Sequence, residues 1–272
     1  MPLVRPLCAA LLCLSTAALA APRPALVPGG IAHVPIASAT LPRPTVRLGE
    51  HPVLVRQEGK QWMAWVGLPL DLPPGPLALT VREGTHERSL SLTIKPKDYP
   101  VQRLTVKNRR MVNPDPADLA RIEKEAATQA EVKTLFRDED HPALDFIAPV
   151  EGRRSSAYGL RRFFNGEPRA PHRGLDIAAA RGTSIRTPAA GIVTHVGDFF
   201  FNGKTVFVDH GQGLISMFCH MDRVAVAAGT RVDQGTVLGA VGSTGRATGP
   251  HLHWSVFLNG TPVDPALFID TP

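Results

Sequence analysis

Two histidines separated by one residue lie near the C-terminus, in the motif His251-Leu-His253. The apolar residues that follow predict a β-strand, and side chains at positions i and i+2 of a strand point to the same face. The segment His172-Arg-Gly-Leu-Asp176 lies about eighty residues upstream, and His220 lies between the two. Considered by itself, the C-terminal motif is explained by a pair of surface histidines. Three separate segments rich in histidine and aspartate together indicate a metal site.

The residue types of these segments suit a catalytic zinc ion. If residues 172–176 are extended, His172 and Asp176 share a face. An imidazole nitrogen, a carboxylate oxygen and one further histidine then supply three ligands and leave a fourth position for water, which is the coordination of catalytic zinc. No cysteine pair offers a structural alternative. The H-x-x-x-D spacing is a weak signal alone and a strong one in combination with H-x-H.

The composition is that of a globular protein with a basic balance. Of its 272 residues, 43% are hydrophobic and 20% charged, and the length allows one large domain or two ordinary ones. A formal net charge of +6 and a pI of about 9.6 suit an anionic partner such as nucleic acid, a membrane surface or a cell-wall polymer. The basic residues are scattered and not interleaved with aromatic residues, which argues against nucleic acid.

The first twenty residues have the pattern of a secretory signal peptide. Arg5 supplies a positive charge, an apolar run follows, and Ala-Leu-Ala20 is an A-x-A cleavage site. Neither Cys8 nor Cys13 follows a small residue, as a lipoprotein signal requires, and the run is short for a retained anchor. We therefore predict export to the periplasm or cell wall. The mature chain would keep Cys219 alone, without an intramolecular disulfide and without stable insertion into a membrane.

The segments before the histidine motifs predict a mainly β fold with one connecting helix. Residues 21–44 are rich in proline, alanine and glycine, which indicates an extended lead-in. Residues 45–110 contain short alternating runs between turn residues, which predicts a small N-terminal β-sandwich. Residues 113–137 carry apolar residues at helical spacing, with Asp115 as N-cap and Pro116 as the first helical residue. This helix connects the domains and could also lie across the groove of the next one.

The histidine motifs lie in residues 144–270, where glycine, valine and threonine predominate. Runs such as 204–209 and 214–218 predict strands, and turn residues such as those at 202–203 lie between them. We therefore expect a second, antiparallel β domain in this part of the chain.

Six motifs follow one another along this domain. They are Ser156-Ala-Tyr158-Gly-Leu-Arg161, His172-Arg-Gly-Leu-Asp176, Pro188-Ala-Ala-Gly191, Val208-Asp-His210-Gly, Phe218-Cys-His220-Met and Gly245-Arg-Ala-Thr-Gly249-Pro-His251-Leu-His253. Their order resembles that of the LytM/lysostaphin-type zinc metallopeptidases, which cut peptide bonds of bacterial peptidoglycan. The resemblance covers residues 146–268. The preceding β segment is similar to the N-terminal domain of some secreted bacterial members.

Carried over by position, the resemblance implies His172, Asp176 and His253 as ligands of Zn2+. It implies His220 and His251 as a catalytic pair that does not bind the metal. Zinc would lower the pKa of a bound water and polarise the scissile carbonyl, and the free histidines would act as general base or hold the oxyanion. The sequence has no H-E-x-x-H helix, so a histidine would take the role that glutamate has in those proteases.

The expected function is an exported zinc metalloendopeptidase that hydrolyses stem-peptide and cross-link bonds of peptidoglycan. The alternative is a catalytically silent domain that binds peptidoglycan and activates a cell-wall amidase. A biotinyl or lipoyl carrier is excluded because the turn at 242–245 has no acceptor lysine. Diaminopimelate cross-links and glycine bridges are both substrates in the resembled family. Export without disulfides favours the D-alanyl–diaminopimelate bond and a Gram-negative periplasm.

Three other residues and the helix complete the expectations. Tyr158 either packs or contacts substrate, whereas His210 and Cys219 are expected to be structural. We also expect the N-terminal domain or the helix to restrict access to the zinc groove, because they directly precede the catalytic domain.

Overall fold

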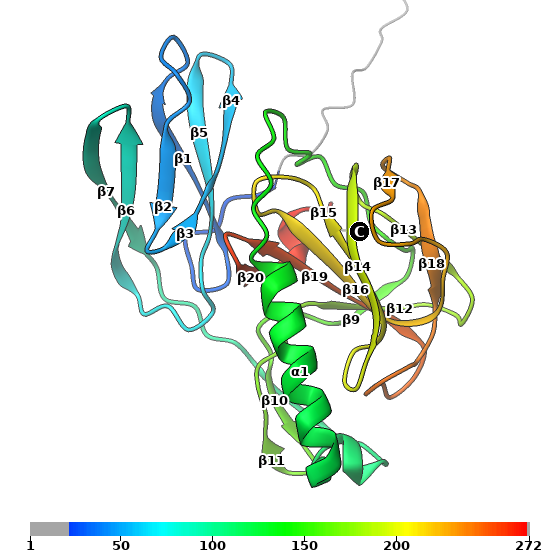
Figure 1. The fold of residues 1–272 in the computed structure, drawn as a ribbon. Coiled ribbons are helices and arrows are strands. Elements are labelled where there is room, and N and C mark those ends of the chain that lie inside the picture. The colour runs from blue at the N-terminus through cyan, green and yellow to red at the C-terminus, as the bar shows by residue number, and fades with distance from the viewer. Residues whose placement is uncertain (1–21, 271–272) are drawn as a thin grey trace, which may run out of the picture.

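The computed structural model describes residues 22–270, which form strands and one long helix. The predicted signal peptide, residues 1–20, lies outside the described residues. The mainly β fold class predicted from the sequence is confirmed (Figure 1). No helix in residues 22–270 combines the length and the apolar character needed to cross a membrane.

The N-terminal part of the described chain forms two facing sheets (Figure 1). Its strands are β1 (Ile31–Ser38), β2 (Thr45–Leu48), β3 (His51–Pro52), β4 (Leu54–Glu58), β5 (Gln61–Gly67), β6 (Gly75–Glu83) and β7 (His86–Ile94). One sheet has the order β1-β5-β4 and the other β3-β2-β6-β7. Ala64 and Val66 of the first sheet share a core with Leu79 and Val81 of the second, because alternate side chains of each strand point inward.

Two segments differ from the sequence expectation. The extended lead-in predicted for residues 21–44 contains β1, which pairs with β5 on both sides of Pro35. A proline is tolerated there because β1 is an edge strand and its register shifts between Pro35 and Ala37. The segment at 101–106, expected in the N-terminal sandwich, contains β8 (Val101–Leu104), which pairs in parallel with β10 (Arg161–Phe164). Such a long-range pairing leaves no local signal in the sequence.

The C-terminal part is built on one large sheet, whose neighbouring strands are antiparallel. Within residues 22–270 the sheet has the order β17-β14-β15-β16-β19-β12-β9, with β13, β18 and β20 attached to it. The strands that carry the histidine and aspartate motifs, β16, β19 and β12, are therefore consecutive neighbours. The remaining elements are β9 (Arg153–Ser156), β11 (Glu167–Pro168), β12 (Leu175–Ala178), β13 (Ser184–Arg186), β14 (Gly191–Phe199), β15 (Gly203–Asp209), β16 (Ile215–Val224), β17 (Arg231–Val232), β18 (Val237–Val241), β19 (His251–Leu258), β20 (Thr261–Val263) and two 3-10 turns, Arg109–Met111 and Pro265–Leu267.

Helix α1 (Pro116–Lys133) joins the two parts and runs across the front of the C-terminal sheet (Figure 1). It starts as predicted, with Asp115 at the N-cap and Pro116 at the first position. The carboxylate of Asp118 accepts a hydrogen bond from the Asp115 backbone N–H at 3.3 Å, which completes the first turn. At the other end, Val132 packs into a cluster with Phe207 and other apolar residues of the sheet.

Two buried amide side chains attach the N-terminal sheets to the C-terminal domain. Gln212 accepts a hydrogen bond from the Val55 backbone N–H at 2.8 Å and donates to the Val55 carbonyl at 3.1 Å. Asn259 Oδ1 accepts a hydrogen bond from the Gly67 backbone N–H at 2.6 Å, and Asn259 Nδ2 donates to the Gly67 carbonyl at 3.1 Å. Buried backbone groups require such partners, so each amide replaces a strand neighbour. Trp65 also packs into the C-terminal core, which fixes the two parts against each other.

His210, which follows β15, is buried as a neutral side chain. Its Nδ1–H donates to the Ala190 carbonyl at 2.8 Å, and its Nε2 lies 2.9 Å from the Ser216 hydroxyl. Burial lowers the pKa of His210 to about 4, because the charged form would lose its hydration. This environment agrees with the structural role that the sequence predicted.

We predict that His210 makes the protein sensitive to acid. Its folded-state pKa lies below its unfolded value of about 6.5, so its contribution is fully present above pH 6.5 and is lost as the pH falls toward 4. The loss is about 3 kcal/mol for this group alone. Chemical denaturation of the wild type and of His210→Gln between pH 8 and 4 should show a flatter pH dependence for the variant. An equally flat profile for His141→Gln, a change at an exposed position, would contradict this assignment.

Candidate metal centre

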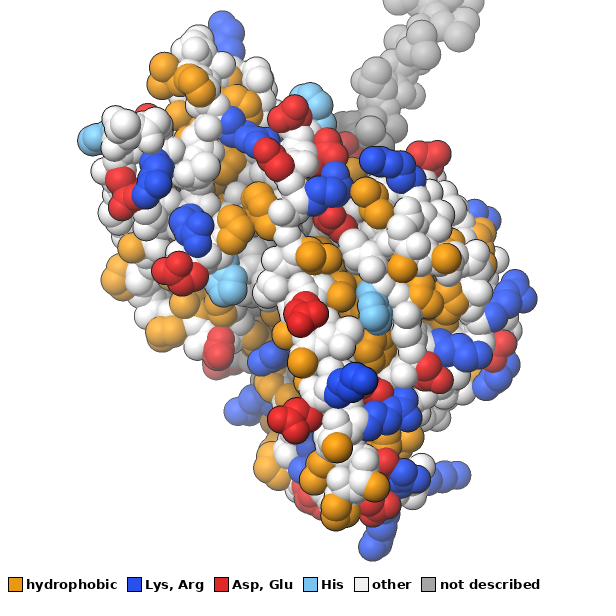
Figure 2. Space-filling view, viewed as in Figure 1, with side chains coloured by type: hydrophobic (Ala, Val, Ile, Leu, Met, Phe, Trp, Pro, Cys, Tyr) orange, Lys and Arg blue, Asp and Glu red, His pale blue; other side chains and the backbone are white. Residues whose placement is uncertain are grey.

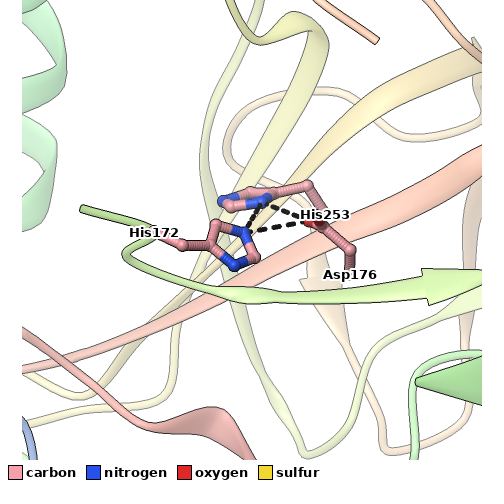
Figure 3. A group of neighbouring side chains, drawn as sticks. All are labelled: His172, Asp176 and His253. Carbon is pink, nitrogen blue, oxygen red and sulfur yellow. Dashed lines mark hydrogen bonds and ion pairs between the residues drawn. The ribbon is translucent and has the colours of Figure 1, made fainter. Parts of the chain in front are cut away.

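His172, Asp176 and His253 point toward one another beside β12 and β19 of the large sheet (Figure 3). Asp176 of β12 lies directly opposite His253 of β19 in the antiparallel register, so their side chains share a face. His172 lies in the loop that leads into β12 and turns back toward both. Gly174 permits this approach, since a Cβ at that position would lie 2.6 Å from the imidazole of His253.

The three inward atoms are separated by short distances. His172 Nε2 lies 3.0 Å from Asp176 Oδ1 and 3.0 Å from His253 Nδ1, and His253 Nδ1 lies 2.8 Å from Asp176 Oδ1. In a tetrahedral zinc site with bonds of about 2.0–2.1 Å, ligand atoms lie about 3.3 Å apart. A zinc ion therefore fits after each side chain moves by a few tenths of an ångström.

The outward hydrogen bonds place the imidazole protons away from this centre. The Nδ1 of His172 lies 2.7 Å from the Ala157 carbonyl, which can only accept, so that nitrogen carries the proton. Ser255 Oγ donates to the Arg173 carbonyl at 2.8 Å and therefore accepts from His253 Nε2–H at 3.0 Å. His172 Nε2 and His253 Nδ1 are then lone-pair atoms facing a carboxylate. Three lone-pair atoms with no proton between them repel one another unless a cation lies between them. Two imidazole nitrogens and one carboxylate oxygen are a set of ligands that suits zinc.

The protonation states of the ligands agree with metal binding. Burial lowers the pKa of His253 to about 4, so its imidazole is neutral at neutral pH. The carboxylate of Asp176 is paired with the guanidinium of Arg162, which favours its charged form. Arg162 on β10 donates to the second carboxylate oxygen, Oδ2, at 2.9 Å and orients it. Oδ1 thus remains available to a metal.

His220 and His251 lie beside this centre and are not part of it. The Nδ1–H of His220 donates to the Thr244 carbonyl and that of His251 to the Gly249 carbonyl, each at 2.8 Å. Both leave Nε2 without its proton, and His251 Nε2 lies 3.8 Å from Asp176 Oδ1. The two rings are 4.8 Å apart between centroids. Burial, followed by the neighbouring histidines, lowers the pKa of His220 to about 3.

His220 has a strained backbone. Its φ is +62°, a region that residues other than glycine rarely adopt, at a cost of about 1–3 kcal/mol. The strain falls at a bulge of β16, where the register with β15 shifts beside the site. The bulge turns His220 toward the centre, while Cys219 stays buried on the other face. The packing role predicted for Cys219 agrees with this position.

A hollow of about 570 Å3 is lined by Asp176 and His253 of this group and by both His220 and His251. One wall is formed by α1, and no residue from 22 to 100 lines it. The helix therefore covers the groove, whereas the N-terminal sheets do not. Figure 2 shows that the outer side of this face carries acidic and basic side chains interspersed with hydrophobic ones.

Three contributors to the site were absent from the sequence prediction. Ser255 lies two residues after His253 on the same strand face, and this spacing could have identified it. Arg162 and Thr244 act across strands and leave no local pattern. Tyr158, left open between two roles, is buried and donates its hydroxyl hydrogen to the Pro262 carbonyl at 2.7 Å, which makes it a packing residue.

Comparison with known proteins agrees with this fold. Residues 170–265 match the model of peptidase family M23, and residues 25–97 match that of the peptidase family M23 N-terminal domain. A crystal structure from Pseudomonas aeruginosa, described as a peptidase M23, superposes with a TM-score of 0.75 and 45% identity, covering 89% of this chain and 94% of that one. The chain belongs to peptidase family M23, which confirms the resemblance found in the sequence.

Curated relatives match less than half of the chain. DD-carboxypeptidase/endopeptidase Mpg of Neisseria meningitidis serogroup B is 39% identical over 124 residues, which are 45% of this chain and 29% of the relative. Peptidoglycan DD-endopeptidase ShyC of Vibrio cholerae serotype O1 is 39% identical over 121 residues, 43% of this chain and 28% of the relative. The match thus spans less than a third of the length of these relatives.

The proton arrangement predicts that Ser255 supports metal binding. In Ser255→Ala, His253 Nε2–H loses its acceptor and the imidazole is no longer held with its lone pair inward. Zinc affinity, measured by competition with a chromogenic chelator, should fall roughly 10- to 100-fold. Asp176→Ala should lose tight binding altogether. Ser243→Ala, whose hydroxyl accepts from Arg181 away from the centre, should bind like the wild type. Wild-type affinity in Ser255→Ala would refute the assigned tautomer.

Proposed function

We propose that this chain is a zinc-dependent endopeptidase that hydrolyses peptide bonds of bacterial peptidoglycan in the periplasm or cell wall. The observation that carries the proposal is the group of facing lone-pair atoms of His172, Asp176 and His253, which lies beside two histidines whose Nε2 atoms carry no proton. The names of the curated relatives, which include peptidoglycan DD-endopeptidases, support the substrate class and the location. Stem peptides and their cross-links are thus the proposed partners.

His172, Asp176 and His253 would hold the zinc ion, which lowers the pKa of bound water toward 7 and polarises the scissile carbonyl. His251 is the better placed general base, because its Nε2 is 3.8 Å from a ligand oxygen. A proton accepted there produces an imidazolium, which the Gly249 carbonyl stabilises through Nδ1–H. That imidazolium can then donate to the leaving amine.

His220 lines the same hollow from β16, the strand next to β19. Its Nδ1–H is held by Thr244, so Nε2 points at the reacting groups as an acceptor. It can position the attacking water or, once protonated, donate to the developing oxyanion. Its strained backbone favours a fixed orientation over an adaptable one.

The complete set of five side chains weighs against the catalytically silent alternative, which would bind peptidoglycan and activate an amidase. Asp176, His253, His220 and His251 line one hollow, and His172 Nε2 lies behind them, 3.0 Å from both Asp176 Oδ1 and His253 Nδ1. We propose the D-alanyl–diaminopimelate cross-link as the bond cut, in keeping with the relatives named DD-endopeptidases.

Digestion of purified cross-linked muropeptides by the zinc-loaded chain tests the proposal. Mass spectrometry should show loss of cross-linked dimer, which stops with a chelator and resumes with zinc. His251→Ala and His220→Ala should each reduce the rate roughly 10²- to 10⁴-fold while retaining zinc. His86→Ala, an exposed change on β7, serves as the matched control. Absence of cleavage by the zinc-loaded wild type would favour the silent alternative.

The position of α1 predicts that this helix limits activity. Arg121 donates to the Asp198 carbonyl at 2.9 Å, and Glu125 accepts from the Phe200 backbone N–H at 2.7 Å, so the helix is attached beside the groove. Glu125→Ala removes the second contact and should raise the cleavage rate on the order of tenfold by favouring an open helix. Glu123→Ala removes the same charge from an exposed position and should leave the rate unchanged. Equal rates in the two variants would contradict a covering role.

A further inference from the structure

The loop between β18 and β19 carries an arginine that the proposed mechanism does not use. Arg246 lines the same hollow as the metal ligands. Its neighbours Arg162 and Arg169 are each paired with a carboxylate, those of Asp176 and Glu167 respectively. Arg246 has no carboxylate within ion-pair distance anywhere in residues 22–270. It is a half-buried cation without a counter-ion, beside the metal centre.

Two aromatic rings pack against this guanidinium. Its central carbon lies 4.8 Å from the ring centroid of Phe164 and 4.3 Å from that of Phe201. The Arg246 backbone N–H also donates to the Phe201 carbonyl at 2.8 Å. The preceding Gly245 packs so closely that a Cβ there would lie 2.4 Å from the Gly203 nitrogen. Backbone and side chain are therefore both held in place before any ligand arrives.

One edge of the guanidinium has no hydrogen-bond acceptor. Nη1 donates weakly to the Met111 carbonyl at 3.4 Å, whereas Nε and Nη2 have no acceptor among the described residues. Leaving charged donors unsatisfied is unfavourable, and a carboxylate is the group that matches two parallel N–H donors. Burial, together with repulsion from Arg162 and Arg169, lowers the pKa of Arg246 to about 10, which still leaves it charged at neutral pH. The local excess of positive charge favours an anion.

We propose that Arg246 binds a free carboxylate of the substrate peptide next to the scissile bond, and so selects diaminopimelate cross-links over glycine bridges. This inference rests on the proposed function. In a D-alanyl–diaminopimelate cross-link, the carbon that bears the scissile nitrogen also bears a free carboxylate. A glycine bridge has no such group beside its bonds. Arg246 is thus a specificity residue and takes no part in proton transfer.

Two substrates that differ in one group test this role. The first is a cross-linked peptide dimer with the free carboxylate beside the scissile bond, and the second is the same dimer with that carboxylate amidated. The zinc-loaded chain should cleave the first with a kcat/KM roughly 10- to 100-fold higher. Arg246→Gln should cleave both substrates at similar rates, because the variant loses the faster cleavage of the free carboxylate form and keeps its rate on the amidated form. Covering of the groove by α1 affects both substrates equally and cancels in the ratio.

Controls separate recognition from folding and from the proposed activity. Arg161→Gln changes an exposed arginine on the same strand as Phe164 and should keep the wild-type preference. The wild-type ratio alone is informative if Arg246→Gln does not fold: a ratio near one overturns the inference while leaving the peptidase activity intact. An equal loss on both substrates in a folded Arg246→Gln also overturns it, since that result indicates a structural role. Cleavage of neither substrate by the wild type refutes the proposed function, and this inference with it.

Discussion

Mutual repulsion between three acceptor atoms is the constraint on which the rest of this structure depends. His172 Nε2, Asp176 Oδ1 and His253 Nδ1 face one another within 2.8–3.0 Å, and the outward partners hold the imidazole protons elsewhere. Buried lone pairs in such contact are unfavourable unless a cation lies between them. The binding energy of a metal would therefore also stabilise the fold around it.

The surrounding sheet is organised to maintain this arrangement. The register of β12 against β19 sets Asp176 opposite His253, and Gly174 leaves room for the imidazole. The neighbouring strand β16 contributes His220 through a bulge with a strained backbone, so catalytic geometry is obtained at a local cost in stability. The N-terminal sheets are attached by Gln212 and Asn259 and contribute no residue to the lining of the hollow, which leaves α1 as the element that covers the groove.

The sequence predicts the parts of this site that have local signatures. The spacing of His172 to Asp176 and of His251 to His253, together with the family resemblance, predicted five side chains that lie close together in the structure, and Asp115-Pro116 predicted the start of α1. Contacts between distant segments had no such signature. The pairing of β8 with β10, the bond from Arg162 to Asp176 and the covering of the groove by α1 depend on how separate elements meet. The strand β1 escaped prediction because its proline and small residues resemble a linker, although an edge strand tolerates them.

Anomalous X-ray scattering from crystals of the zinc-loaded protein, measured on both sides of the zinc absorption edge, tests the central claim most directly. We expect a single strong peak at about 2.0–2.2 Å from His172 Nε2, Asp176 Oδ1 and His253 Nδ1, with His220 and His251 outside bonding distance. A peak bonded to His220 or His251, or no peak between the three atoms, would contradict it.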